Sequence, residues 1–68
     1  MRHALDFQFS RAGSLCILTP LTRRARKWAA EFLPEDAAQY ASGTVIEVRY
    51  MPDILRALQA HELVYAQA

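Results

Sequence analysis

Four basic side chains lie within five positions of one another, and their type and spacing make them the first candidates for a binding contact. They follow Thr22, whose position fits a helix N-cap, and we call them the basic pole: Arg23, Arg24, Arg26 and Lys27. Because a helix N-terminus carries partial positive charge, cations there are mildly unfavourable for the helix itself. Four cations on one exposed helix face can instead contact phosphates or an acidic protein surface.

The same cluster also has a purely structural interpretation, and it has an acidic counterpart. Arg24 can pair with Glu31 or Glu35. Lys27 can pair with Glu31, and the cluster would then be a solvated face without a partner. The acidic residues near and beyond the end of the helix form what we call the acidic pole: Glu31, Glu35, Asp36 and Glu47. An acidic patch on a small protein can engage a basic groove, including one that binds nucleic acid.

The charges divide the chain into a basic half and an acidic half. Residues 1–30 contain six basic residues and one acidic residue, whereas residues 31–68 contain two basic and six acidic residues. With histidine neutral, the formal charges of the two halves are +5 and −4, although the whole chain carries only +1. Such asymmetry predicts an electrostatic partner.

The cysteine, histidine and glycine residues form no recognisable catalytic or metal-binding motif. Cys16 and His61 are a candidate thiol–imidazole pair, but Cys16 lies in an apolar segment and no third residue orients the imidazole. His3, Cys16 and His61 are too scattered to predict a metal site. With Gly13 and Gly43 as its only glycines, the chain has no glycine-rich phosphate loop. We expect no enzyme activity, no metal and no cofactor, with a cysteine-dependent activity at Cys16 as an alternative.

The length and composition of the chain predict one small domain, residues 1–68. A domain of this size buries only about 60% of the surface of its unfolded chain, so a cofactor pocket would remove much of the core. The composition, 53% hydrophobic and 22% charged, is typical of a globular protein. We see no apolar run long enough for a membrane span and no signal peptide. With a single cysteine, we expect a cytoplasmic protein without an intrachain disulfide, as a monomer or a weak homodimer.

Hydrophobic periodicity predicts two strands joined by a tight turn in the first twenty residues. Leu5, Phe7 and Phe9 alternate with polar residues, which is typical of a half-buried strand. Gly13 in "SRAGS" can adopt a positive φ, so we expect a hairpin turn there. The run "LCILT", residues 15–19, is apolar on both faces and favours a more central strand.

Helices are expected after these strands. The first has apolar residues at the spacing of one helical face: Ala25, Trp28, Ala29 and Phe32. Pro34 should end this helix near Leu33. Pro34, Glu35 and Asp36 have residue types typical of a first helical turn, so we expect residues 34–41 to form a second, short helix that Gly43 ends.

A third strand and a last helix complete the pattern. The β-branched run "TVIEVRY", residues 44–50, predicts a strand. Pro52 and Asp53 are expected to begin a helix whose buried residues include Ile54, Leu55 and Leu58. The segment "LVYA", residues 63–66, is expected to add a short strand or to pack against the domain.

The order of these elements predicts a two-layer α+β fold. The main order is β-β-α-β-α, and we expect a small antiparallel or mixed sheet of three to four strands packed by two main helices. The expected core joins helix residues to sheet residues: Trp28, Phe32, Leu55 and Leu58 with Phe7, Phe9, Ile17, Ile46 and Val48.

The stretches "GSLCILTPLTRRARKWAAEFLPEDAAQY" and "GTVIEVRYMPDIL" resemble a class of short, uncharacterised bacterial and mobile-element proteins. The positions that carry the resemblance are Gly13, Ser14, Pro20, Leu21, Thr22, Trp28, Leu33, Pro34, Asp36, Glu47, Arg49 and Tyr50. The resemblance covers most of the chain. It implies that these positions maintain the fold and that the chain has no enzyme activity. In size, single-domain organisation and charge polarity the chain also resembles phage-encoded anti-CRISPR proteins, a resemblance that assigns no residue roles.

These observations lead to the hypothesis of a non-enzymatic protein-binding module. It would act as a phage-type inhibitor that docks on a larger nucleoprotein, such as a CRISPR effector complex, and blocks nucleic-acid binding. Its contact would use the basic pole, the acidic pole or both. The alternative is direct nucleic-acid binding by the basic pole, which we rank below a protein partner. We expect no membrane association.

Overall fold

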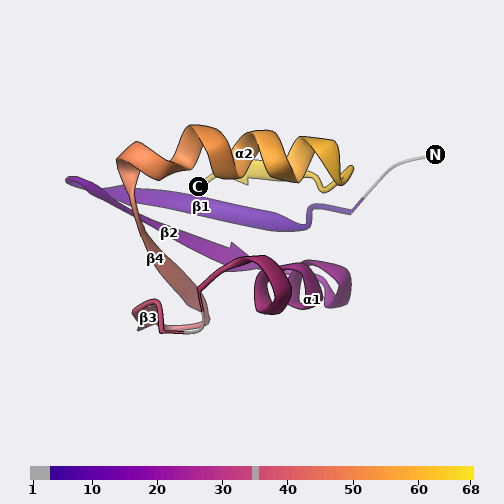
Figure 1. Cartoon of the computed structure of the whole chain (residues 1–68), viewed down its shortest axis with the longest axis horizontal. Coiled ribbons are helices and arrows are strands. Elements are labelled where there is room, and N and C mark those ends of the chain that lie inside the picture. The colour runs from indigo at the N-terminus through magenta and orange to yellow at the C-terminus, as the bar shows by residue number, and fades with distance from the viewer. Residues whose placement is uncertain (1–3, 35) are drawn as a thin grey trace.

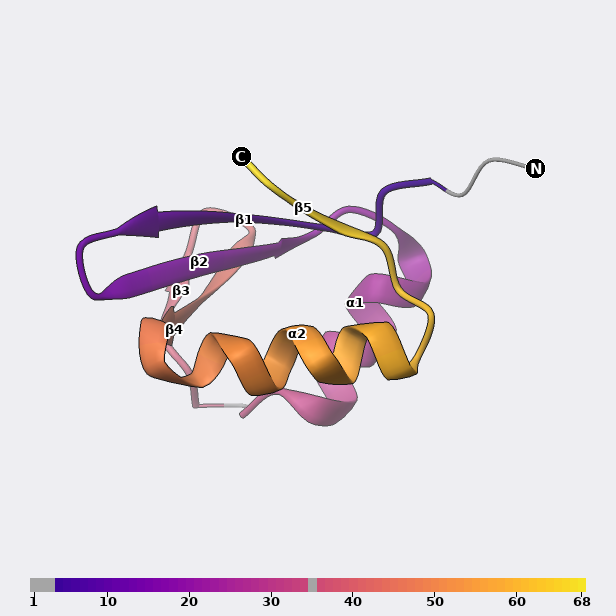
Figure 2. The ribbon, with the colours of Figure 1, turned by 90° about the horizontal axis from the view of Figure 1, so that it is seen from above.

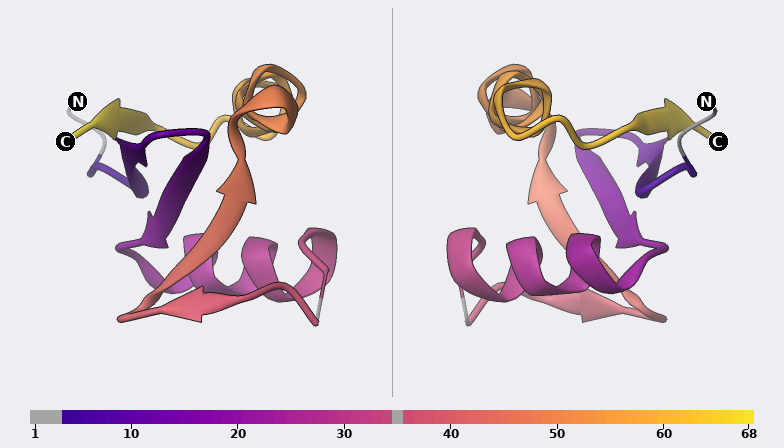
Figure 3. Two further views of the ribbon diagram at one scale, coloured as in Figure 1. Left: turned by 90° about the vertical axis from the view of Figure 1, so that its left-hand side faces the viewer. Right: turned by 90° about the vertical axis from the view of Figure 1, so that its right-hand side faces the viewer.

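The computed structural model describes residues 4–34 and 36–68 and shows two layers, a sheet and a pair of helices (Figure 1). The sheet is mixed and has five strands in the order β3-β4-β2-β1-β5. Both helices lie on the same side of this sheet (Figure 3). The predicted α+β class and the two main helices are confirmed. The number of strands is wrong, because β3 and β5 extend the sheet beyond the expected three to four.

The N-terminal hairpin forms as its sequence predicts. Strand β1, Phe7–Ala12, pairs antiparallel with β2, Leu15–Pro20, and Ala12 lies opposite Leu15. Gly13, the first of the two turn residues, has a φ of 64°. A positive φ at this position is what a type II′ turn requires, and its twist suits the strands. β2 then lies between β1 and β4, so its more central position is also confirmed.

Helix α1, Arg23–Phe32, begins and ends where expected. The Thr22 hydroxyl accepts a hydrogen bond of 3.2 Å from the backbone N–H of Ala25. Leu33 is extended and donates its N–H to the carbonyl of Ala29 as the helix stops before Pro34. The predicted buried face is only partly correct, because Phe32 is 55% exposed and packs against Trp28 at the surface.

The predicted short helix at residues 34–41 is wrong. In the described part of this segment, turns lead to the two-residue strand β3, Gln39–Tyr40, which pairs with β4, Gly43–Glu47. A helix of two turns is marginal on its own, and the edge of β4 offers hydrogen bonds instead. One of these joins the N–H of Val45 to the carbonyl of Ala38 at 2.8 Å.

Gly43 is therefore a strand residue and not the end of a helix. A Cβ atom at this position would lie 2.6 Å from Cγ2 of Ile17 and 2.7 Å from Oγ1 of Thr19. The glycine is needed because the side chains of β2 lean over the start of β4.

The predicted strand at residues 44–50 is too long by three residues. Val48–Tyr50 form a 3₁₀ turn, η1, which leads directly into helix α2, Met51–Ala60. Pro52 and Asp53 occupy the first turn of α2, as predicted. Among the described residues, no helix is long and apolar enough to cross a membrane. The chain then forms the short strand β5, Tyr65–Gln67, which runs parallel to β1 (Figure 2).

The core lies between the helix layer and one face of the sheet. Its buried apolar residues are Phe7, Cys16, Leu18, Ala25, Trp28, Ile46, Met51, Leu58 and Leu63. Because side chains alternate along a strand, Cys16 and Leu18 face the helices and Ile17 faces away. The prediction that Ile17 belongs to this core is therefore wrong. Phe9, Val48 and Leu55 pack against the core and are partly buried.

Candidate binding site

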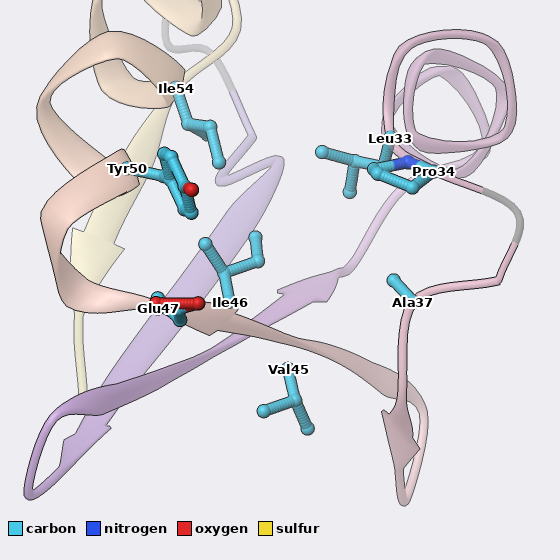
Figure 4. Close-up of a pocket in the computed structure, with 8 residues that line it drawn as sticks. All are labelled: Leu33, Pro34, Ala37, Val45, Ile46, Glu47, Tyr50 and Ile54. Carbon is cyan, nitrogen blue, oxygen red and sulfur yellow. The ribbon is translucent and has the colours of Figure 1, made fainter.

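An apolar pocket of about 460 Å³ lies between the end of α1 and the start of α2. It is lined by Leu33, Pro34, Ala37, Val45, Ile46, Glu47, Tyr50 and Ile54 (Figure 4). Ile46 rises from β4 toward Ile54 on one side and Leu33 on the other (Figure 4). Pockets of 300–1,000 Å³ with mostly apolar walls are typical of binding sites.

The pocket exists because three local features leave a gap in the helix layer. Pro34 stops α1, so Leu33 leaves the helix as an extended residue at the pocket wall. The 3₁₀ turn places Tyr50 at the opposite wall, immediately before α2. β3 pairs only with Gly43 and Thr44, so it leaves the later part of β4 uncovered along that edge.

Charged groups lie at the mouth of this pocket. The Nε atom of Arg49 donates to Oε1 of Glu47 at 3.0 Å, and its guanidinium carbon lies 4.8 Å from the centre of the Tyr50 ring. Both charged side chains of this pair are more than half exposed. Asp36 is exposed in the segment between Pro34 and Ala37, which both line the pocket. One member of the acidic pole, Glu47, therefore lines this apolar cavity, and a second, Asp36, lies in the segment that forms part of its wall.

The other members of the acidic pole do not join this site. Glu31 lines a separate, open groove of about 320 Å³ between α1 and the residues that follow α2. Glu35 lies outside the described residues. The structure therefore does not assemble the acidic pole into one surface.

The groove beside Glu31 has an aromatic wall that sequence reasoning missed. The centre of the Phe32 ring lies 5.2 Å from the centre of the Trp28 ring and 5.2 Å from the centre of the His61 ring. The cations Arg24 and Lys27 line the same groove. Because Glu31 stands beside these cations, the rim of the groove carries mixed charge. Within the described residues, the indole N–H of Trp28 is buried without a hydrogen-bond partner.

The basic pole separates into two kinds of residue. Arg23, Arg26 and Lys27 are exposed, and the ion pairs found among the described residues do not include them. Arg24 instead pairs with Asp6, not with Glu31. Three of the four predicted contact residues are thus available at the surface of α1, whereas Arg24, although about half exposed, is held by Asp6.

Asp6 is the charged residue whose role the sequence did not reveal. Its carboxylate is buried and accepts hydrogen bonds from the Thr22 hydroxyl at 2.6 Å and from Nε and Nη2 of Arg24 at 3.0 and 2.8 Å. The N–H of Val64 adds another hydrogen bond at 2.9 Å. The Arg24 hydrogen bonds above all, then those from Thr22 and Val64, hold the pKa of Asp6 well below its usual range despite the opposing effect of burial.

The strand pattern predicts Asp6 on the solvent side, but the residue is buried, and a local irregularity of the backbone explains why. The N–H groups of Asp6 and Phe7 both donate to the carbonyl of Val64, at 2.8 and 3.0 Å. Two residues facing one on the partner strand are typical of a bulge, so consecutive side chains are both buried. The signal available in the sequence was the helix N-terminus itself, because α1 has three arginines and no acid in its first turn.

Cys16 and His61 are not brought together. Cys16 lies in the core and lines a cavity with Met51 and Pro52 at the start of α2. His61 follows the end of the same helix. Ten residues of helix separate them by about 15 Å. The described residues contain no group of three or more metal-ligating side chains, and His3 lies outside them.

Compared with protein-family models, with curated proteins and with solved structures, the chain shows no significant match. The resemblances described from the sequence therefore stay predictions. The candidate site has apolar walls, with the Tyr50 side chain and the Glu47 carboxylate among the groups that line it.

Proposed function

We propose that the chain is a non-enzymatic protein-binding module that docks on a basic surface of a larger nucleoprotein and competes there with nucleic acid. The observation that carries this proposal is the apolar pocket that Glu47 lines, with Asp36 exposed in the segment between the lining residues Pro34 and Ala37. An apolar anchor of the partner fills the pocket, and cations beside that anchor meet the two carboxylates.

The mixed charge of the groove between α1 and the residues that follow α2 makes this groove a weaker candidate for the contact. A nucleic acid that followed the cations of α1 would meet Glu31 in the same groove. Arg24 is already paired with Asp6, which leaves three cations for phosphates. The fold therefore favours a protein partner over direct nucleic-acid binding.

Affinity capture with matched baits tests the proposal. The baits are the wild type, Asp36→Lys combined with Glu47→Lys, Glu31→Lys as the matched acid outside the pocket, and Arg23→Glu combined with Arg26→Glu. We expect one basic partner to bind the wild type, the Glu31 variant and the basic-pole variant, and to be lost from the pocket variant. Added single-stranded or duplex oligonucleotide should compete with the wild type for that partner.

Two outcomes would refute the docking site. One is equal recovery of the partner by the pocket variant and the wild type. The other is loss of the partner only when Arg23 and Arg26 are reversed, which would move the contact to the basic pole. Circular dichroism of each bait confirms that binding is compared between folded proteins.

A further inference from the structure

The face of the sheet that points away from both helices carries almost no charge. The pairing register places on it Gln8, Ser10 and Ala12 of β1, Leu15, Ile17 and Thr19 of β2, Gly43, Val45 and Glu47 of β4, Tyr40 of β3 and Ala66 of β5. Glu47, at the end of β4, is the one charged residue among them and is already paired with Arg49. No helix in the described part of the chain covers this face (Figure 3).

The centre of this face is apolar. Ile17 lies opposite Val45 in the pairing of β2 with β4. Leu15 is 40% exposed next to them, and Tyr40 at the edge is 65% exposed. Gly43 contributes no side chain, and the Ile17 and Thr19 side chains lean over it. Exposed apolar and aromatic residues gathered on one face are typical of an interaction surface.

The absence of charge decides what kind of partner fits. A nucleic acid needs cations, and among the described residues of this face there are none. An acidic protein surface would find no counter-charge there, and a basic one would find only Glu47 at the end of β4, which already pairs with Arg49. A second copy of the same face fits, because its centre is also uncharged and apolar. Two identical faces can pair with each other about a two-fold axis.

The size of the face indicates a weak dimer. Five strands of two to six residues, spaced about 4.8 Å apart, give a footprint of at most about 400 Å² per copy. Two copies would bury about 800 Å², which is less than the roughly 1,200–2,000 Å² of stable interfaces. Association should therefore depend strongly on protein concentration.

We propose that two copies of this chain associate through their uncovered sheet faces, with Leu15 and Ile17 at the centre of the contact. This contact adjoins the proposed docking pocket and shares Val45 and Glu47 with it, whereas the other residues that line the pocket are not among those of this face. It leaves the outer face of α1 and the aromatic groove outside the dimer.

Sedimentation equilibrium over a range of concentrations tests this dimer. The wild type should approach twice the monomer mass, with a dissociation constant between about 10 μM and 1 mM. Leu15→Lys and, separately, Ala12→Glu place a charge on the uncovered face at exposed positions, and each should weaken the dimer at least tenfold. Leu21→Lys is the matched control, because Leu21 is 42% exposed and lies outside this face. It should change the dissociation constant less than twofold.

Salt distinguishes this contact from one made by the charged poles. Raising the ionic strength should leave the dimer unchanged or strengthen it, because no ion pairs form across the face. A wild type that stays monomeric at 1 mM would overturn the proposal. So would a dimer that salt dissociates, or a Leu21→Lys variant as weak as Leu15→Lys. Ala12→Glu, whose position pairs with Leu15 and not with Glu47, should still capture the basic partner, so failure of the dimer and failure of the docking site are seen separately.

Discussion

Two arginine–carboxylate pairs lie in different regions of the molecule and differ in what surrounds them. The Asp6 carboxylate is 2% exposed and joins Arg24, Thr22 and the backbone before β5. The Glu47 and Arg49 side chains are 51% and 70% exposed and contact only local groups at the pocket mouth. The comparison shows that an ion pair contributes to stability when one of its partners is buried away from water. When both partners remain hydrated, the pair contributes little to stability and its charges stay available for binding.

The strongest test of this comparison is Asp6→Asn. The substitution removes the negative charge beside Arg24 while keeping the shape of the side chain. We expect the free energy of unfolding to fall by about 3 kcal/mol, the low end for a broken buried pair because Arg24 is half exposed. Urea denaturation followed by circular dichroism measures the change. Asp53→Asn breaks an exposed pair with Arg56 and is the control, expected within about 0.5 kcal/mol of the wild type.

If the two variants lost equal stability, the distinction between buried and exposed pairs would be wrong. The same result would also mean that Asp6 contributes no more to the stability of the fold than an exposed carboxylate does.

Acidification should act through the same carboxylate. Because the pKa of Asp6 is lowered in the folded state, its stabilising contribution is full above the unfolded value of about 3.9 and is lost as the pH falls below it. The wild type and Asp6→Asn should therefore differ most near pH 7 and approach one another in strong acid. Thermal melting at pH 2 to 7 measures the difference. A gap that does not narrow below pH 4 would mean that the charge of Asp6 is not the source of its effect.

At the other end of the molecule, filling the pocket should alter binding more than stability. Ala37→Leu adds apolar volume to a half-buried pocket wall, and we expect the free energy of unfolding to change by less than about 1 kcal/mol. Capture of the basic partner should fall at least tenfold, because the anchor side chain loses its space. Ala38→Leu, an exposed neighbour that does not line the pocket, is the control. Equal capture by Ala37→Leu and the wild type would show that the pocket is not used.

The smallest effect on folding is expected for Glu47→Gln. Both partners of its ion pair are hydrated, so the free energy of unfolding should change by less than about 0.5 kcal/mol. Binding of the basic partner should still weaken several-fold at low salt and less at high salt. The measurements are urea denaturation and capture at two ionic strengths. A fall of about 2 kcal/mol or more in the free energy of unfolding would show that the Glu47–Arg49 pair stabilises the fold as a buried pair does.

Local signals predicted the elements whose ends are determined by nearby residues. The hairpin follows from Gly13, the start of α1 from Thr22 and its end from Pro34, and all three are as expected. Signals of this kind act over a few residues and need no knowledge of distant parts of the chain.

The errors arose where distant segments decide the structure. Residues 34–41 have the residue types of a helix start, yet their backbone pairs with β4. Asp6 occupies a polar, solvent-facing position in the strand pattern, yet hydrogen bonds from α1 and from Val64 keep its side chain buried. The candidate pocket could not be predicted either, because it forms between residues of α1, β4 and α2 that only the fold brings together.

The pairing of β1 with β5 has a consequence for how the chain folds during synthesis. Asp6 and Val64 are 58 positions apart, and the hydrogen bonds between them close nearly the longest loop that this sequence allows. Closing a loop of that length costs entropy before any contact compensates for it, which slows folding. A nascent chain therefore carries Asp6 and Arg24 without the Val64 and Glu62 backbone groups that complete their hydrogen bonds until that segment leaves the ribosome. We expect the domain to stay protease-sensitive until then and to acquire resistance in a single step.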